Sequence, residues 1–179
     1  MKRAVFLDRD GVVNLPIIRG GKPYPPASVE DLVIPDEVKE GLGLLKKLGL
    51  PLLVVTNQPD VARGTQTREA VEAINFGLLR ALPLDAIYVC YHDDTDNCDC
   101  RKPKPGLIWQ GARDWGVDPA KSFLVGDRWR DIAAGQQAAC TAIFLDFQYA
   151  ETQPVPPYYR VSNLLEAARL IEKLILTEE

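Results

Sequence analysis

The sequence predicts an α/β protein built on a doubly wound parallel sheet. Short apolar runs of strand length alternate with longer stretches of helical periodicity along the 179 residues. The apolar runs are continuous rather than alternating, which is typical of parallel strands covered on both faces. The chain contains no internal repeat and no low-complexity segment, so we expect residues 1–179 to form one domain.

Five short apolar runs are predicted to be strands, because each has strand length and is rich in β-branched or large apolar residues. Parallel neighbours among them require helical crossovers, which are right-handed and cover both faces of the sheet. The predicted strands are Ala4–Leu7, Leu50–Thr56, Ala86–Cys90, Phe123–Gly126 and Thr141–Leu145.

Five intervening segments carry helical periodicity and helix boundary signals. Pro35 precedes the first helix and Gly49 follows it, Thr67 is a predicted N-cap, and Gly116 ends the third helix. Two segments rich in Pro or Gly are predicted to be irregular. These are Pro16–Pro26, which should overhang the carboxyl end of the sheet, and Gln153–Pro157. The predicted helices are Asp36–Leu48, Thr67–Leu82, Pro105–Trp115, Asp131–Gln137 and Leu164–Leu176.

Composition excludes several classes of function. A net charge of −4 does not fit a generally basic nucleic-acid binder. The longest apolar runs are strand-sized, so we expect no membrane-spanning segment. The N-terminal residues lack the pattern of a signal peptide, and we expect a cytoplasmic protein. His92 is the only histidine and lies within a cysteine cluster, which excludes a Ser-His-Asp triad.

Polar and charged residues follow four of the predicted strands, at the edge where ligands bind in open α/β sheets. Clustered carboxylates repel one another unless a cation lies among them, and oxygen ligands favour Mg²⁺. A carboxylate there could also attack phosphorus and form an aspartyl-phosphate. Taken singly, each motif is equally typical of a turn or a solvated charged loop. The motifs are Asp8-Arg9-Asp10-Gly11, Thr56-Asn57-Gln58, Arg101-Lys102 and Gly126-Asp127-Arg128.

These motifs, in this order, resemble those of the haloacid dehalogenase superfamily of phosphatases. The resemblance implies a fold of that type, without a large cap domain. It implies that Asp8 is the nucleophile, that Asp10 is the general acid and then the base, and that Thr56 and Lys102 hold the phosphoryl oxygens. Magnesium would bind Asp8, the Asp10 backbone carbonyl and Asp127. The more distant Asp131 would support the ion through water.

A closer resemblance, to the histidinol-phosphate and heptose-bisphosphate phosphatases, rests on Thr56-Asn57-Gln58 and on Cys98-Asp99-Cys100-Arg101-Lys102-Pro103. It implies Mg²⁺-dependent hydrolysis of a small sugar phosphomonoester, with a heptose bisphosphate preferred and histidinol phosphate as the alternative. A catalytically idle module that binds phosphorylated ligands is the hypothesis from another class. The implied substrate contacts are Arg9, Asn57, Gln58, Arg101, Arg128 and Tyr24.

Three cysteines and the single histidine gather within residues 90–100. Cys90, His92, Cys98 and Cys100 could hold a structural zinc ion in a closed tetrahedral site. The alternative is a core cysteine at position 90 beside an exposed histidine. We expect residues 93–97 to form a solvent-exposed tip. The fourth cysteine, Cys140, is predicted to be a core thiol.

Two features depart from the resembled family. Pro59-Asp60 follows Gln58, which adds a negative charge near the expected anion site and removes a backbone donor. In the segment Pro16–Pro26, Arg19 or Lys22 could meet a second phosphate or could simply be solvated. No insertion is long enough for a separate cap, so we expect an open site, a small phosphorylated substrate as the only partner, and a monomer.

Overall fold

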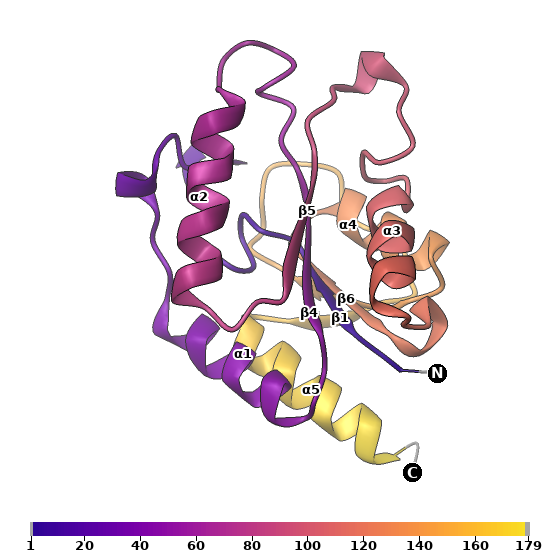
Figure 1. Cartoon of the computed structure of the whole chain (residues 1–179). Coiled ribbons are helices and arrows are strands. Elements are labelled where there is room, and N and C mark those ends of the chain that lie inside the picture. Colours follow the sequence, from indigo (N-terminus) through magenta and orange to yellow (C-terminus); the bar gives the residue numbers. More distant parts are fainter. Residues whose placement is uncertain (1, 178–179) are drawn as a thin grey trace.

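The computed structural model describes residues 2–177, which are built around one six-stranded parallel sheet (Figure 1). The strand order is β5-β4-β1-β6-β7-β8, so β1 lies inside the sheet between β4 and β6. The five predicted strands are confirmed, with shifts of at most two residues at their ends. The strands are β1 Val5–Leu7, β4 Leu52–Asn57, β5 Ala86–Cys90, β6 Phe123–Gly126, β7 Thr141–Leu145 and β8 Tyr159–Val161.

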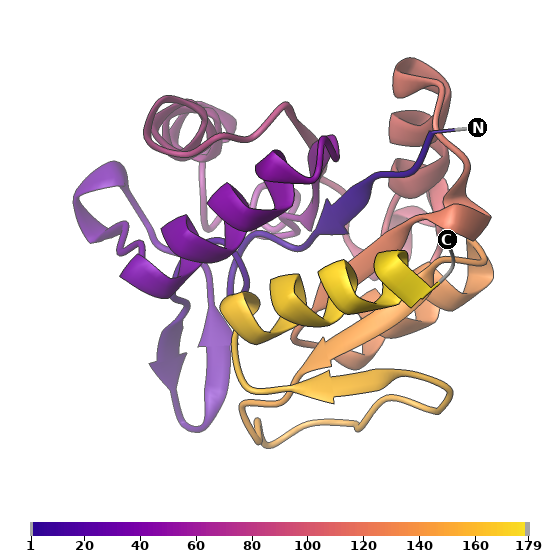
Figure 2. The same ribbon diagram turned by 90° about the horizontal axis from the view of Figure 1, so that it is seen from below.

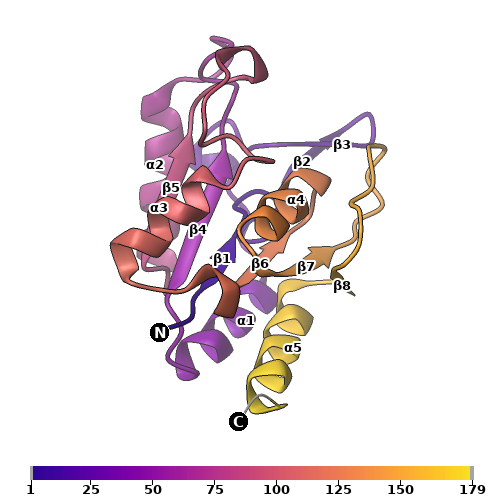
Figure 3. The ribbon, with the colours of Figure 1, turned by 90° about the vertical axis from the view of Figure 1, so that its right-hand side faces the viewer.

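Helices cover both faces of the sheet, as the doubly wound prediction requires (Figures 1 and 3). Apolar side chains of α1, α2 and α5 pack on one face, and those of α3 and α4 pack on the other. Figure 2 shows α1 and α5 side by side beneath the sheet. The helices are α1 Asp36–Lys47, α2 Arg68–Ala81, α3 Gly106–Trp115, α4 Trp129–Gln137 and α5 Leu164–Thr177.

Three strands of the structure are absent from the sequence prediction. The segment expected to be irregular contains a hairpin, β2 Ile17–Arg19 and β3 Lys22–Tyr24. Its turn residues Gly20 and Gly21 both have positive φ, as a two-residue hairpin turn requires, but Pro23 within the second strand hid the pattern. The three-residue β8 pairs only with β7 at the sheet edge and is too short to show a periodicity.

Three 3₁₀ turns connect the larger elements, at Val29–Asp31, Asp94–Asp96 and Pro119–Lys121. Thr67 is confirmed as the N-cap of α2, since its hydroxyl accepts a hydrogen bond from the Ala70 N–H at 3.1 Å. Among residues 2–177, no helix combines the length and the apolar character needed to cross a bilayer.

Gly135 lets α4 lie close to β6, and this contact supports a first prediction. A Cβ at position 135 would come within 2.6 Å of the Leu124 side chain, whereas a Cβ at Gly43 in α1 would meet nothing within 4 Å. Gly135→Ala should therefore destabilise the protein by about 1–3 kcal/mol through overpacking. Gly43→Ala should be neutral or stabilising by up to about 1 kcal/mol. Urea unfolding of both variants measures this, and equal effects of the two substitutions would contradict it.

Candidate active site

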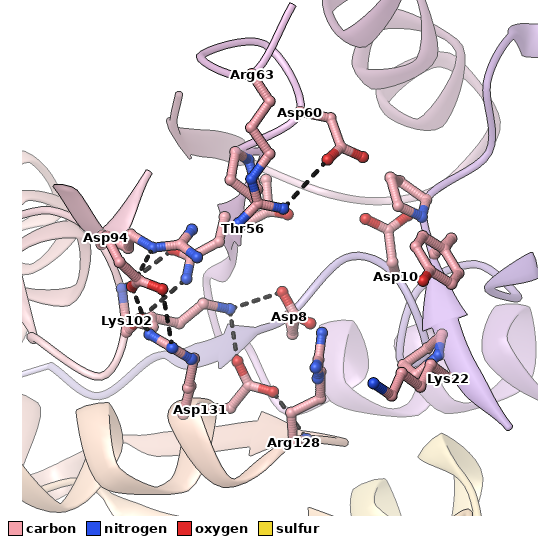
Figure 4. A pocket seen from close by; sticks show the side chains of 17 residues that line it. Asp8, Asp10, Lys22, Thr56, Asp60, Arg63, Asp94, Lys102, Arg128 and Asp131 are labelled. Carbon is pink, nitrogen blue, oxygen red and sulfur yellow. Dashed lines mark hydrogen bonds and ion pairs between the residues drawn. The ribbon is translucent and has the colours of Figure 1, made fainter. Parts of the chain in front are cut away.

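A pocket of about 300 Å³ opens at the carboxyl ends of β1 and β4 (Figure 4). Asp8 and Asp10 follow β1, Thr56 ends β4 with Asn57, and Lys102 reaches the same point from the loop after β5. Four of the predicted catalytic side chains, those of Asp8, Asp10, Thr56 and Lys102, thus line one cavity. Their convergence follows from the parallel topology, in which strand ends from distant parts of the sequence meet at one edge.

The Lys102 ammonium lies at the centre of the pocket floor. It donates to Asp8 Oδ1 at 2.7 Å and to the Val55 carbonyl at 2.7 Å, and it forms an ion pair with Asp131 Oδ1 at 2.6 Å. Burial alone would lower the pKa of Lys102, but the Asp131 and Asp8 carboxylates raise it above its ordinary value. Lys102 is therefore a fixed positive charge beside Asp8.

Unlike Asp8 and Asp131, Asp127 has no ion pair with Lys102. It follows β6, is 1% exposed, and neither of its carboxylate oxygens has a hydrogen-bond partner of normal geometry in the described structure. The Tyr149 phenol faces it, and burial together with the Asp127 charge raises the pKa of that phenol. Burial, with the charges of Asp8 and Asp131 added, raises the pKa of Asp127 well above its ordinary value. A buried carboxylate with both oxygens free is a strong candidate for a cation ligand.

The three carboxylates Asp8, Asp127 and Asp131 fit a hard divalent cation. One oxygen from each lies within 4.8 Å of the others, and all three residues are buried. Burial raises the pKa of Asp8 to about 6, with Asp131 adding to the rise and Lys102 opposing it. Oxygen-only donors of this kind suit Mg²⁺. Asp131, implied by the resemblance to support the ion through water, is a member of this cluster, and α4 begins two residues earlier than predicted, at Trp129.

Gly11 makes the close approach of the two strand ends possible. It has a φ of +97°, and a Cβ at this position would lie 1.9 Å from Asp127 Oδ2. The backbone turn after Asp10 therefore packs directly against the Asp127 carboxylate, and only glycine permits that contact.

Asp10 accepts four hydrogen bonds from three side chains. Arg9 donates from Nε at 3.2 Å and from Nη2 at 3.1 Å, Asn14 donates at 3.0 Å, and Gln58 donates at 2.9 Å. Arg9 and Gln58, which the resemblance implied as substrate contacts, are 0% and 1% exposed. Neither lies on the pocket wall. The Arg9 side chain donates to Asp10 and Asn75, and the Gln58 amide donates to Asp10 and Thr56.

Asn57 lines the pocket, but its amide is committed to the protein. It donates to the Lys102 carbonyl at 3.0 Å and accepts from the Lys102 N–H at 3.0 Å. This paired contact fixes the loop that carries Lys102 against the end of β4. Asn57, predicted as a substrate contact, therefore holds Lys102 in position with its amide.

The pocket rim carries a network of arginines and aspartates that the sequence did not predict. Asp94 accepts from Arg101 Nε at 2.8 Å and from Arg130 Nη1 at 2.9 Å, and Asp93 accepts twice from Arg63 at 2.7 Å. The hydrogen bond from Arg101 lowers the pKa of Asp94, and the bonds from Arg63 lower that of Asp93 to about 2. Residues 94–97 are exposed, as expected of this tip, and Asp93 and Asp94 bind three guanidinium groups at the mouth of the pocket.

Arg128 and the β2–β3 hairpin form the opposite wall (Figure 4). The Arg128 guanidinium pairs with Glu151, and the neighbouring Ala150 N–H donates to the carbonyl at the hairpin tip, Gly21, at 3.2 Å. Tyr24 lines the pocket as predicted and is 41% exposed. The neighbouring Lys22 also lines the pocket, and no ion pair of its ammonium occurs within residues 2–177.

The four predicted zinc ligands converge at one end of the rim. Cys90, His92, Cys98 and Cys100 each offer a ligand atom within 4.8 Å of the others. Three of the separations, 3.6 Å between Cys90 and Cys98, 3.5 Å between Cys98 and Cys100, and 3.3 Å between His92 and Cys100, are near those of a tetrahedral zinc site, about 3.3–3.8 Å. The Cys90 and Cys100 sulfurs are closer, at 2.7 Å, and would separate around an ion. Cys140 lies elsewhere, buried in the core.

The uncompensated charge of Asp127 leads to a second prediction. Because the pKa of Asp127 is higher in the folded chain than in the unfolded chain, its ionisation costs stability as the pH rises above about 4. Asp127→Asn should therefore raise the melting temperature at pH 8 in chelator and abolish the further rise that MgCl₂ produces in the unaltered protein. Asp99→Asn, at a fully exposed side chain, is the control. A Tm of Asp127→Asn that still rises with MgCl₂ as in the unaltered protein would contradict the assignment.

Comparisons with known proteins agree with this geometry. A family model described as haloacid dehalogenase-like hydrolase matches residues 24–139. The D-glycero-beta-D-manno-heptose-1,7-bisphosphate 7-phosphatase of Pasteurella multocida is 38% identical over 149 residues, which cover 77% of this chain and 78% of that protein. The enzyme of the same name from Helicobacter pylori strain J99 is 40% identical over 142 residues, covering 76% and 78%.

Solved structures show the same similarity over the whole chain. The crystal structure of the D,D-heptose 1,7-bisphosphate phosphatase from B. bronchiseptica, complexed with magnesium and phosphate, matches with a TM-score of 0.79 and 28% identity, covering 100% of both chains. The strand order, the absence of a large cap among the described residues and the carboxylates at the strand ends fit this relationship. This chain belongs to the haloacid dehalogenase-like hydrolases.

Proposed function

We propose that this protein is a Mg²⁺-dependent phosphatase that removes the 7-phosphate of D-glycero-D-manno-heptose 1,7-bisphosphate through an aspartyl-phosphate on Asp8. The observation that carries the chemistry is the placement of Asp8 beside Lys102 and the buried carboxylate cluster, with Asp10 on the same pocket wall. The similarity to phosphatases named for this substrate supports its identity. We also propose that residues 1–179 act as one domain, with residues 90–100 as its zinc-binding loop.

In the first step, an Asp8 carboxylate oxygen attacks phosphorus and the bond from phosphorus to the sugar oxygen breaks. Asp10 gives its proton to that oxygen, which leaves as the sugar hydroxyl. The Lys102 ammonium, 2.7 Å from Asp8, and the Thr56 hydroxyl lie where they can stabilise the phosphoryl oxygens. A magnesium ion held by Asp8, Asp127, the Asp10 carbonyl and Asp131 would neutralise negative charge among the carboxylates and the phosphoryl group.

In the second step, Asp10 takes a proton from water, whose oxygen attacks phosphorus. The bond between phosphorus and Asp8 then breaks, which releases inorganic phosphate and restores the Asp8 carboxylate. Because the described chain has no free imidazole in the pocket, Asp10 is the side chain that can move both protons.

The rim of the pocket supports a substrate with a second anionic group. Five cations line the pocket in addition to Lys102: Lys22, Arg63, Arg101, Arg128 and Arg130. Four of them already pair with aspartates or a glutamate, so a distal phosphate would compete for partly exposed guanidinium groups. Arg101, Arg128 and Tyr24 remain proposed substrate contacts on this basis.

A panel of phosphomonoesters tests the proposed function. The unaltered protein should release phosphate from the heptose 1,7-bisphosphate with a higher kcat/KM than from the heptose 7-phosphate or histidinol phosphate, and only with Mg²⁺ present. Asp8→Asn should lower kcat by at least about a thousandfold, because the attacking oxygen is lost. Asp99→Asn should leave kcat unchanged.

Each outcome of the panel decides a separate point. Preference for histidinol phosphate would overturn the proposed substrate and retain the chemistry. An Asp8→Asn variant as active as the unaltered protein would overturn the chemistry. Ligand binding without turnover in the unaltered protein would favour a binding module.

Zinc is proposed to hold the loop that delivers Arg101 and Lys102 to the pocket. The Arg101 N–H and the neighbouring thiols lower the pKa of Cys98 to about 7 against the opposing effect of burial, so its thiolate is accessible near neutral pH. Cys98→Ser should lose bound zinc and lower kcat/KM by misplacing the loop, whereas Cys140→Ser should keep both. Metal analysis of freshly purified protein, with no chelator, measures the zinc content; its absence from the unaltered protein would refute the site.

A further inference from the structure

The hydrogen bonds around Asp10 leave its carboxylate a single orientation. Arg9 grips both oxygens through Nε and Nη2, while Asn14 adds a bond to Oδ1 and Gln58 adds one to Oδ2. Four hydrogen bonds match the number of acceptor sites on a carboxylate, so a protonated Asp10 has to give up one of them. The Asn14 and Gln58 amides can release it, because they also donate to the Leu15 carbonyl and the Thr56 hydroxyl, whereas the paired bonds from Arg9 stay. Arg9 differs from the two amides because it can only donate, and its two parallel bonds fix the plane of the carboxylate.

Arg9 is itself held by a residue from a different part of the fold. Its third nitrogen, Nη1, donates to Asn75 Oδ1 at 2.8 Å, and Asn75 lies in α2 with 7% exposure. Arg9 is 0% exposed, so its only polar surroundings are those that the protein supplies. A buried guanidinium is costly unless its donors are satisfied, and Asn75 provides the acceptor.

The position of Asn75 in the sequence strengthens this interpretation. It stands on the core-facing side of α2, where the other buried residues are the apolar Val71, Ile74 and Leu78. A buried amide among apolar residues destabilises a helix packing surface unless its hydrogen bonds compensate. The hydrogen bond from Arg9 therefore explains why an amide, rather than an apolar side chain, occupies this buried position.

We propose that Arg9 and Asn75 are positioning residues that aim the Asp10 carboxyl group at the leaving-group oxygen. Asn75 orients the Arg9 guanidinium, Arg9 orients Asp10, and Asp10 carries out the proton transfers. This inference rests on the proposed function, because it assigns Asp10 the role of general acid. It gives Arg9 a role other than the substrate contact expected from the sequence, and this role fits its full burial.

A comparison of leaving groups separates this role from a general structural one. A sugar or other alkyl alkoxide needs a proton as it leaves, whereas p-nitrophenolate leaves without one, so only the alkyl ester depends on a correctly aimed acid. The experiment measures release of the alcohol or of p-nitrophenol in a single turnover, with enzyme in excess over substrate and Mg²⁺ present. It therefore reports the first chemical step alone.

Three variants at neighbouring positions of α2 make the test specific. Asn75→Leu removes the acceptor and keeps the volume, Asn75→Asp keeps an acceptor oxygen for Arg9, and Ile74→Val perturbs the same buried face without touching Arg9. Asn75→Leu should slow release of the alkyl leaving group by at least about tenfold and leave p-nitrophenol release within about twofold. Asn75→Asp and Ile74→Val should keep the ratio of the two rates found in the unaltered protein.

Other outcomes would overturn the proposal. An equal slowing of both esters by Asn75→Leu would indicate a structural role, and an unchanged alkyl rate would show that Arg9 needs no help from Asn75. An Asn75→Asp variant that behaves as Asn75→Leu would exclude the acceptor as the cause. Any alkyl phosphomonoester that the unaltered protein hydrolyses can serve, so a wrong choice of heptose substrate would not affect this result.

Discussion

One ammonium group, that of Lys102, faces two buried carboxylates, while a third carboxylate a few ångströms away has no partner. This imbalance of charge is what the rest of the site depends on. Lys102 pairs with Asp8 and Asp131, whereas neither oxygen of Asp127 has a hydrogen bond of normal geometry. Only the Tyr149 phenol and the Arg128 charge oppose the rise that burial causes in the pKa of Asp127. In a low-dielectric surrounding such a group requires either a proton or a cation. The same deficit of positive charge is the physical basis of the divalent-ion site proposed at these three carboxylates.

The fold can sustain this deficit because the strands beneath it are rigid. Every residue of β1 and β6 is buried, and neighbouring parallel strands hold Asp8 and Asp127 at adjacent ends. Two glycines then allow contacts that a Cβ would prevent. Gly11 passes against Asp127, and a Cβ at Gly126 would fall 2.2 Å from that of Asp131. Packing of the apolar core therefore offsets the repulsion between carboxylates that the strands hold close together.

The sequence was sufficient to predict the sheet and the floor of the pocket. Continuous apolar runs located five of the six strands of the sheet. The parallel topology brought Asp8, Thr56 and Lys102 together, although nearly a hundred residues separate the first from the last. Sequence motifs could not distinguish a side chain that faces the substrate from one that faces the protein. Arg9 and Gln58 occur within motifs that suggest ligand contact, yet both are buried. The contact that holds Arg9 comes from Asn75 of α2, in a distant segment of the chain.

The rim was less predictable for a related reason. Asp93 and Asp94 look like solvated residues of an acidic loop, and their arginine partners come from three other segments of the chain. These ion pairs form only in the tertiary structure, so the local sequence around Asp93 and Asp94 could not predict them. A short hairpin interrupted by Pro23 gives an equally weak signal, because its stability comes from contacts such as the one between Gly21 and Ala150 rather than from strand propensity.

The floor of the pocket (Asp8, Lys102, Asp127 and Asp131) and its rim (Asp93, Asp94 and their arginine partners) therefore hold their charges in different ways. The carboxylates of the floor are buried and fixed by the sheet, so their geometry cannot relax without disturbing the core. The ion pairs of the rim are partly exposed, and such pairs contribute little stability because water competes for both partners. In the proposed mechanism a substrate phosphate competes with Asp94 for Arg130, whereas Asp8 has to stay beside Lys102 to act as the nucleophile. The proposed mechanism therefore places phosphoryl transfer on the floor of the pocket and substrate choice on its rim.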